Sequence, residues 1–286
     1  MRCFFASDLH GRVDRYRKLF RLIERERPDA VFLGGDLLPT PLDSGWSSEP
    51  GLTDFVRDFL AAELEKLSLT LGEVYPRVLV ILGNDDPRYE EKAFMRAGDR
   101  GIWEYIHNLK VTVDGVPIYG YAYVPPTPFL LKDWERYDVS RHVDVGCVSP
   151  EEGRRTVPVS AREVRYATIE KDLEGLTGDD DLERAVFLFH SPPYRTKLDR
   201  AALDGRMVDH APVDVHCGSV AIRRLIEKRQ PLITLHGHIH ESAELTGSWR
   251  DHIGRTHMFS AAHNGPELAL VRFSPDDPES ATRELH

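Results

Sequence analysis

Residues 1–11 read MRCFFASDLHG and join an apolar run to two polar side chains at its end. The run CFFA (residues 3–6) is typical of a strand that is buried on both faces. Asp8 and His10 follow it, and Gly11 allows the backbone to turn. Alone, an Asp-x-His pair is weak evidence, because chance predicts about one such pair in a chain of this composition. The pair becomes informative only if other strands end in the same way.

Four later apolar runs also end in polar side chains. These runs span residues 30–33, 78–82, 185–189 and 232–235, and they are followed by Asp36, by Asn84, by His190 and by the pair His238 and His240. Apolar residues at helical spacing predict helices over 13–23, 53–67, 161–174 and 219–228, and two further strands are expected near 256–261 and 267–273. Strands that alternate with helices favour an α/β fold with parallel strands.

The polar side chains at these strand ends predict one shared site. In an open α/β sheet, ligands bind at the carboxyl ends of parallel strands, so neighbouring strands would bring these residues together. Two carboxylates, one amide oxygen and four imidazoles are ligands that suit Mn²⁺, Fe²⁺ or Zn²⁺. They are too many for one tetrahedral ion, and they suit two ions about 3.5–4 Å apart that share a carboxylate. Turn chemistry is the alternative for Asp8, Asp36 and Asn84, because Asp and Asn are common where strands end.

The order of these residues resembles the calcineurin-like metallophosphoesterase superfamily. The signature blocks of that family are D-x-H, G-D, G-N-H-[DE], a later single His and G-H-x-H. This chain has DLH at 8–10, GD at 35–36, GNDD at 83–86, His190 and GHIH at 237–240. The surrounding stretches FLFHSPPY and LHGHIHES are most similar to a bacterial and archaeal branch of predicted phosphoesterases.

The resemblance implies a fold, an activity and a set of metal ligands. The fold would be a four-layer αββα sandwich, and the activity would be hydrolysis of phosphate esters by a metal-bound hydroxide. One ion would be bound by Asp8, His10, Asp36 and His240, and the other by Asp36, Asn84, His190 and His238. We expect two divalent ions, with Mn²⁺ preferred and Fe²⁺, Zn²⁺ or Ni²⁺ as alternatives.

Asp85 departs from the family pattern, which has His after the Asn. That His usually protonates the leaving group or binds a phosphate oxygen. A carboxylate beside two cations should be ionised, so Asp85 would be a poor general acid and would repel a phosphate dianion. We therefore predict that diesters are preferred over monoesters. Histidines that could supply the missing proton are His216, His252, His257 and His263.

Other residues invite a role at the site. Arg195 and Lys197 lie just beyond His190 and are candidate substrate-binding cations. His236 precedes the last block, and we favour a structural role for it over a ligand role.

Two further features have a plain structural alternative. A Ser cap on the following helix is a simpler reading of Gly218-Ser219 than a phosphate cradle. Aromatic residues that could stack on a nucleobase are Trp46, Trp134 and Tyr194, although packing is the more common role.

Composition limits the class of protein. The chain has 286 residues with 37 Lys and Arg against 47 Asp and Glu, a formal charge of −10 that argues against broad nucleic-acid binding. No apolar stretch approaches the ~18 residues that span a bilayer. The three cysteines are widely spaced and give no disulfide framework, so we expect a cytoplasmic protein. We predict one domain over 1–286, with an insertion at about 124–182 and a frayed polar tail from about 274.

The leading hypothesis is a binuclear-metal phosphoesterase that acts on a small phosphorylated substrate such as a nucleotide. An inactive scaffold with the same fold is the first alternative, although such proteins typically lose ligands and all seven positions are filled here. A nuclease is the second alternative, and the net charge disfavours it. The sequence alone identifies neither the substrate nor the oligomeric state.

Overall fold

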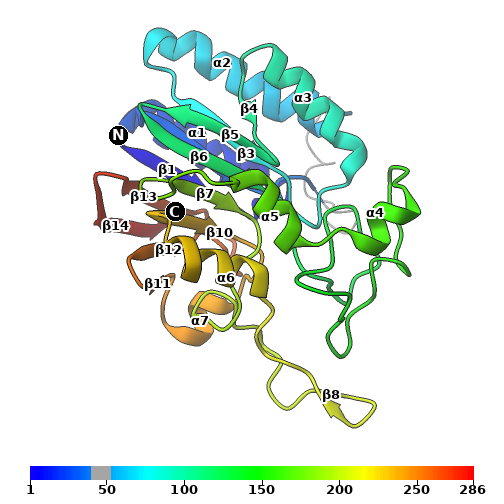
Figure 1. Cartoon of the computed structure of the whole chain (residues 1–286). Coiled ribbons are helices and arrows are strands. Elements are labelled where there is room, and N and C mark those ends of the chain that lie inside the picture. The colour runs from blue at the N-terminus through cyan, green and yellow to red at the C-terminus, as the bar shows by residue number, and fades with distance from the viewer. Residues whose placement is uncertain (40–52) are drawn as a thin grey trace.

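The computed structural model describes residues 1–39 and 53–286 and contains two six-stranded sheets that face each other (Figure 1). The first sheet has the order β14 (Asp277–Leu285), β13 (Ala269–Ser274), β1 (Cys3–Ala6), β2 (Ala30–Gly34), β3 (Arg77–Ile81), β4 (Glu104–Tyr105). The second has the order β11 (Arg250–Ile253), β12 (Thr256–Ser260), β10 (Ile233–His236), β7 (Val186–Phe189), β6 (Val116–Tyr121), β5 (Leu109–Val113). The sheets touch where β2 meets β7 and where β3 meets β6.

The register of the central strands explains why their polar ends lie together. β1 runs parallel to β2 with Ala6 opposite Leu33, and β2 runs parallel to β3 with Leu33 opposite Val80. In the second sheet, β7 and β10 are also parallel, with Leu188 opposite Leu235. The central strands of each sheet therefore end level with one another, as expected for an α/β fold.

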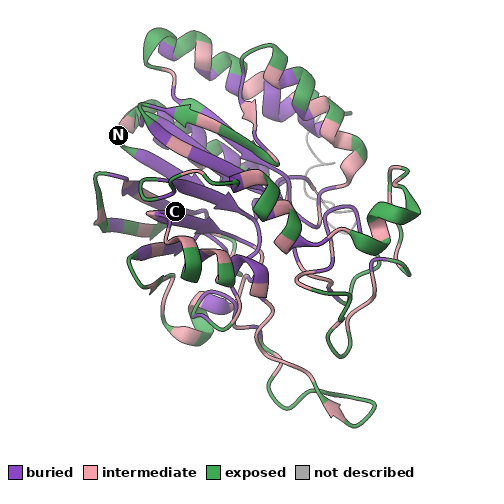
Figure 2. Cartoon of the chain, in the orientation of Figure 1, coloured by how far each residue is buried: buried purple, intermediate pink, exposed green. Residues whose placement is uncertain are grey.

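Helices cover the two sheets and complete the αββα arrangement. Four helices pack with one another along the first sheet: α1 (Val13–Glu26), the π-helix η2 (Phe55–Ala61), α2 (Ala62–Leu71) and α3 (Glu91–Asp99). Two helices pack together beside the second sheet: α5 (Ile169–Thr177) and α6 (Val220–Arg229). Tyr16 of α1 is buried against Phe55 and Phe59 of η2. Figure 2 shows that buried residues fill the sheets and the inner sides of these helices. The α/β sandwich predicted from the sequence is confirmed.

Short elements complete the described chain. They are the 3-10 helices η3 (Gly72–Val74) and η4 (Arg88–Glu90), the helices α4 (Ala161–Tyr166) and α7 (Ser242–Thr246), and the two-residue strands β8 (Met207–Val208) and β9 (Ala211–Pro212). The predicted helix over 161–174 is divided into α4 and α5, because Thr168 caps the second helix by accepting a hydrogen bond from the Lys171 amide at 3.2 Å. The predicted helix over 53–67 begins as η2 and continues to Leu71.

The expectation of a frayed tail from about 274 is wrong. Residues 277–285 form β14, which pairs with β13 with Ala269 opposite Leu285 and Arg272 opposite Thr282. The segment reads as polar because β14 is an edge strand, so that many of its side chains face water.

The segment 124–182 contributes no strand to either sheet, although its buried apolar residues join the common hydrophobic core. Trp134 is fully buried, and the Arg88 guanidinium lies 5.1 Å from its ring centre. Lys132 and Glu135 form a buried ion pair. The segment is tied to the second sheet through Asp138, which accepts hydrogen bonds at the N-terminus of α6 from Ser219 Oγ at 2.6 Å and from the Val220 amide at 2.6 Å.

Candidate metal centre

The predicted ligands occupy loops in an unusual backbone conformation. Asp8, His10, Asp36 and His238 have φ of 55°, 46°, 52° and 73°, in the left-handed region that residues other than Gly rarely adopt. Such strain persists only where the surrounding structure enforces it, and it is concentrated at functional sites. Each loop follows the end of a buried strand, so the fold holds these side chains in place.

Two glycines allow these loops to approach one another closely. A Cβ at Gly83 would lie 2.3 Å from Oδ1 of Asp36, and a Cβ at Gly11 would lie 2.5 Å from the Pro39 side chain. Both distances are impossible contacts, so the chain needs Gly at each position. Gly11 also has φ of 64°, which agrees with the expectation that it makes room for the turn.

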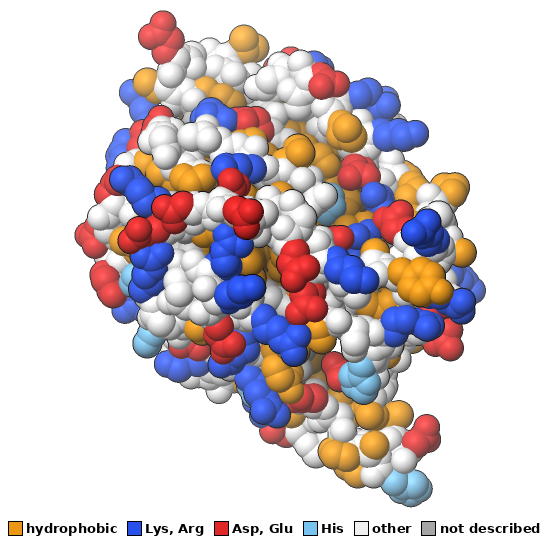
Figure 3. Space-filling view, in the orientation of Figure 1, with side chains coloured by type: hydrophobic (Ala, Val, Ile, Leu, Met, Phe, Trp, Pro, Cys, Tyr) orange, Lys and Arg blue, Asp and Glu red, His pale blue; other side chains and the backbone are white. Residues whose placement is uncertain are grey.

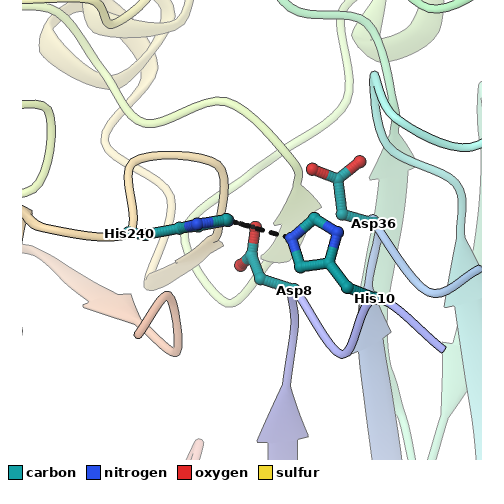
Figure 4. A group of neighbouring side chains, drawn as sticks. All are labelled: Asp8, His10, Asp36 and His240. Carbon is teal, nitrogen blue, oxygen red and sulfur yellow. Dashed lines mark hydrogen bonds and ion pairs between the residues drawn. The ribbon is translucent and has the colours of Figure 1, made fainter. Parts of the chain in front are cut away.

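Asp8, His10, Asp36 and His240 form the first group of candidate ligands, in which one donor atom from each lies within 4.8 Å of the others (Figure 4). Nε2 of His240 is 3.1 Å from Oδ1 of Asp8 and 3.1 Å from Nε2 of His10. Asp8 also accepts a hydrogen bond from the His238 amide at 3.0 Å. The four side chains thus converge from β1, β2 and the loop after β10.

Asp36, His190 and His238 form the second group. Nε2 of His190 lies 3.2 Å from Oδ2 of Asp36 and 3.1 Å from Oδ1 of Asn84. The other ring nitrogen of His190 is 2.8 Å from the Gly34 carbonyl, which fixes the orientation of the ring. Asp36 belongs to both groups, which is the position that a bridging carboxylate requires.

Opposing charges dominate the electrostatics of this buried cluster. Burial raises the pKa of Asp36, but the His190 imidazolium outweighs it and lowers that pKa to about 2. Burial lowers the pKa of His190, whereas Asp36 and Asp8 together raise it to about 10. Burial and the His190 charge lower the pKa of His238 to about 3. Buried carboxylates are stable only beside positive charge. Together with the imidazole nitrogens and the amide oxygen, they form a set of donor atoms that fits divalent cations.

Asp85 lies beside this cluster with 36% of its side chain exposed. Its amide donates to Oδ1 of Asp36 at 2.8 Å, and its Oδ1 accepts from Nδ2 of Asn84 at 2.9 Å. Its Oδ2 is 3.9 Å from Nδ1 of His10. Burial and the negative charge of Asp36 raise the pKa of Asp85 to about 7, whereas bound cations would act in the opposite direction.

Sequence reasoning missed two buried residues that position the ligands. Asp86 is fully buried and accepts hydrogen bonds from the amides of Leu37 and Gly83, at 2.9 and 2.8 Å, so it joins the loops after β2 and β3. Arg15 of α1 donates to the Asp8 carbonyl at 2.6 Å. The acid at position 86 matches the last position of the G-N-H-[DE] block, which was the available signal, whereas no pattern marked Arg15.

A cavity of about 770 Å³ opens from this cluster. Asp36, Asn84, Asp85, His238 and His240 line one end of it. The remaining wall comes from residues 125–129 and 144–147, from part of 201–218, and from Ile239 and Glu241. Part of the 124–182 segment therefore lies against the same cavity as the candidate ligands.

The structure separates the remaining candidates. His216 lines the cavity, with its Nδ1 2.8 Å from the buried Asp199. His252 and His257 lie on β11 and β12, and His263 pairs with Glu267 at 2.9 Å, all outside the described lining of the cavity. Of the four histidines considered as proton donors, only His216 therefore shares the cavity within the described residues.

Arg195 and Lys197 do not line the cavity in the described part of the chain. The Arg195 guanidinium lies 5.2 Å from the Tyr194 ring centre, and the Lys197 amide donates to Asp251. The described lining contains Arg206 as a cation instead. The predicted substrate contacts of Arg195 and Lys197 thus gain no support.

The plainer readings hold for the other features. His236 is buried between the Ser191 carbonyl at 2.9 Å and Thr234 Oγ1 at 2.7 Å, and burial lowers its pKa to about 3. Ser219 caps α6 by accepting from the Ile222 amide at 3.1 Å.

The two aromatic candidates among the described residues do not line the cavity either. Trp134 is buried in packing, Tyr194 is absent from the described lining, and Trp46 lies outside the described residues.

Comparisons with known proteins agree with this geometry. A calcineurin-like phosphoesterase family model matches residues 1–242. Three solved structures are similar over most of both chains. TT1561 of Thermus thermophilus is 17% identical, with a TM-score of 0.56 and an alignment that covers 99% of this chain and 98% of that one. A dimetal phosphatase from Danio rerio is 14% identical, with a TM-score of 0.51 and an alignment that covers 95% of this chain and 91% of that one. A phosphopantetheinyl hydrolase from Mycobacterium tuberculosis is 14% identical (TM-score 0.50; 91% and 89%). No curated protein matches the chain.

The two-sheet sandwich and the two groups of candidate ligands at its strand ends agree with a metallophosphoesterase, the class that the family model indicates. The chain belongs to the calcineurin-like phosphoesterase family. At these identities the three solved structures show the shared fold alone.

Proposed function

We propose that this chain hydrolyses phosphate esters with two divalent ions. Asp8, His10, Asp36 and His240 would hold one ion, and Asp36, Asn84, His190 and His238 the other. The observation that carries the proposal is the shared position of Asp36 in both ligand groups. When bound, such a pair of ions neutralises phosphate oxygens and lowers the pKa of water, which supplies the nucleophile. Mn²⁺ is the preferred candidate for these ions, before Fe²⁺, Zn²⁺ and Ni²⁺.

The chain's own residues would set the choice of substrate. Asp85 faces the same cavity as the ligands, where an ionised carboxylate repels a monoester dianion more than a diester monoanion. We therefore expect diesters to be preferred over monoesters. His216 is held by Asp199 in the cavity wall and is the candidate that could protonate a poor leaving group.

Two alternatives and the cellular location remain as predictions. An inactive scaffold is disfavoured because all seven candidate ligands are brought together. A nuclease is disfavoured because the formal charge is −10.

No described helix has the length and apolar character needed to cross a membrane. The three cysteines are free thiols, which supports the expectation of a cytoplasmic protein.

A substrate panel tests the proposal. Purified protein stripped with EDTA is assayed against aryl monoesters and diesters with Mn²⁺, Fe²⁺, Zn²⁺ or Ni²⁺ restored one at a time. We expect no turnover without metal, the highest turnover with Mn²⁺, and a higher kcat/KM for diesters. If no metal restores hydrolysis of any ester, the enzyme reading fails and the scaffold is favoured.

A further inference from the structure

The wall of the cavity contains an antiparallel arm, residues 200–216, that projects from the body of the protein (Figure 1). Its strands are joined by the Val213 amide bonding to the Arg206 carbonyl at 3.0 Å and by the β8–β9 pairing. Asp209 and His210 form the two-residue turn with φ of 47° and 67°, the geometry of a tight hairpin. The arm is therefore an ordered β-hairpin with side chains on both of its faces.

The arm carries apolar side chains although it is not part of the core. Met207 is 56% exposed and Val208 39% exposed, while Leu203 and Val213 are half-buried, and all four line the cavity. An isolated two-stranded hairpin gains nothing in stability from apolar side chains that remain in water. Their apolar surface instead forms part of the cavity wall.

An apolar surface from the 124–182 segment lines the same cavity. It consists of Pro125, Pro126, Pro128 and Phe129, with Val145 in a second loop. The two surfaces meet at Gly146, where a Cβ would lie only 3.3 Å from Cγ2 of Val208. The cavity thus has a polar end with the candidate metal ligands and an apolar part between two separate segments of the chain. Space-filling Figure 3 shows hydrophobic side chains gathered on the projecting arm.

The charges of the lining limit the substrate further. Beyond the ligand end, the described lining contains Asp144, Asp214 and Glu241 against the single cation Arg206. A substrate with several phosphates would meet net negative charge there, whereas one phosphate at the metal end would not. Apart from imidazoles, Phe129 supplies the one aromatic ring of the described lining, beside three prolines.

We propose that the substrate is an amphipathic phosphodiester with one phosphate at the metal end and a linear apolar chain between the arm and residues 125–129. This inference rests on the proposed function and deepens it. In the reaction, the oxygen of water bonds to phosphorus and the bond from phosphorus to the leaving-group oxygen breaks. One proton of the water ends on that oxygen, so that the leaving group departs as an alcohol, and the apolar chain is either on this alcohol or on the phosphate monoester product. Burial of its methylene groups provides the binding energy that a nucleoside would have to obtain from hydrogen bonds.

A chain-length series tests the inference without any variant. The probes are 4-nitrophenyl methyl phosphate, 4-nitrophenyl decyl phosphate below its micelle concentration, and the 4-nitrophenyl ester of thymidine 5′-phosphate, all with Mn²⁺. We expect kcat/KM for the decyl ester to exceed that for the methyl ester at least about tenfold, because each buried methylene contributes about 0.8 kcal/mol, or roughly a factor of four. Equal values for decyl and methyl, or a higher value for the thymidine ester, would overturn the inference while leaving the phosphoesterase intact.

A pair of variants locates the effect. Val208→Asp should lower the decyl-to-methyl ratio of kcat/KM at least about fivefold, because the charge would lie against the chain. Leu69→Asp, at an apolar residue on α2 that is more exposed than Val208 and lies outside the described cavity lining, should leave the ratio unchanged. An unchanged ratio in a folded Val208→Asp protein would contradict the placement of the chain.

A binding measurement keeps the inference separate from turnover. Calorimetry with decyl phosphate and methyl phosphate on the Mn²⁺-loaded protein should show tighter binding of decyl phosphate even if no ester is hydrolysed. Equal binding would refute the apolar subsite, whereas absent hydrolysis with tight decyl binding would refute only the proposed enzyme activity.

Discussion

At the scale of single residues, Asp85 is where this chain departs from its family. Its carboxyl contacts Asn84 at 2.9 Å and lies 3.9 Å from His10, so it is close to both candidate ligand groups. Asp36 and burial raise the pKa of Asp85 to about 7, and cations at the neighbouring ligands would lower it. With the ions bound, Asp85 would therefore be negative and unable to donate a proton at neutral pH.

Replacing Asp85 tests this account of leaving-group preference. Asp85→His should raise kcat for alkyl esters and monoesters by roughly 10²–10⁴-fold, because general acid catalysis contributes that much where it is needed. Aryl diesters should change little, since their leaving groups depart without protonation. The measurement is kcat for both classes on wild type and variant.

Asp85→Asn is the matched control. It removes the negative charge without supplying an acid, so it should help monoesters and leave alkyl diesters slow. If Asp85→His changes all substrates equally, Asp85 has only a structural role.

At the scale of elements, the N-terminus of α6 joins the 124–182 segment to the second sheet. Asp138 accepts hydrogen bonds from Ser219 Oγ and from two amides of the first turn, Val220 at 2.6 Å and Ala221 at 3.2 Å. These bonds satisfy helix amides that would otherwise lack partners, and the negative charge suits the helix N-terminus. They also leave no free amides there for a phosphate.

Asp138→Ala should therefore weaken this joint. We expect a loss of about 1–2 kcal/mol in the free energy of unfolding, the usual effect of removing a helix cap. Urea denaturation measures it. Asp144→Ala, at an exposed residue of the same segment, is the control and should cost less than about 0.5 kcal/mol. A loss no larger for Asp138→Ala than for this control would contradict the joint.

At the scale of the whole molecule, the sequence predicted the central strands and the candidate metal ligands better than the edge strand and the cavity wall. Asp8, Asp36 and His190 each follow a short apolar run, so a local pattern marked both the strand and the side chain at its end. The structure brings Asp8 and Asp36 together because the parallel strands β1 and β2 end at one edge, and His190 joins them because β7 of the facing sheet meets β2.

The remaining features depend on contacts between distant segments. Arg195 is near His190 in sequence, but a backbone φ of 54° at Arg195 lies in a turn that places its guanidinium on Tyr194. The apolar cavity wall combines Phe129 with Val208, which no local pattern connects. β14 has too few apolar residues for its pattern to distinguish an edge strand from a tail.

The central claim is that Asp36 bridges two ions. The most direct test is metal analysis with activity under saturating Mn²⁺ for wild type, Asp36→Ala and His240→Ala. We predict about two equivalents of Mn²⁺ in wild type, about one in His240→Ala and fewer in Asp36→Ala, because removing a bridging carboxylate weakens both sites. Activity should fall furthest in Asp36→Ala. If Asp36→Ala retains two equivalents, or more activity than His240→Ala, Asp36 is not the bridge.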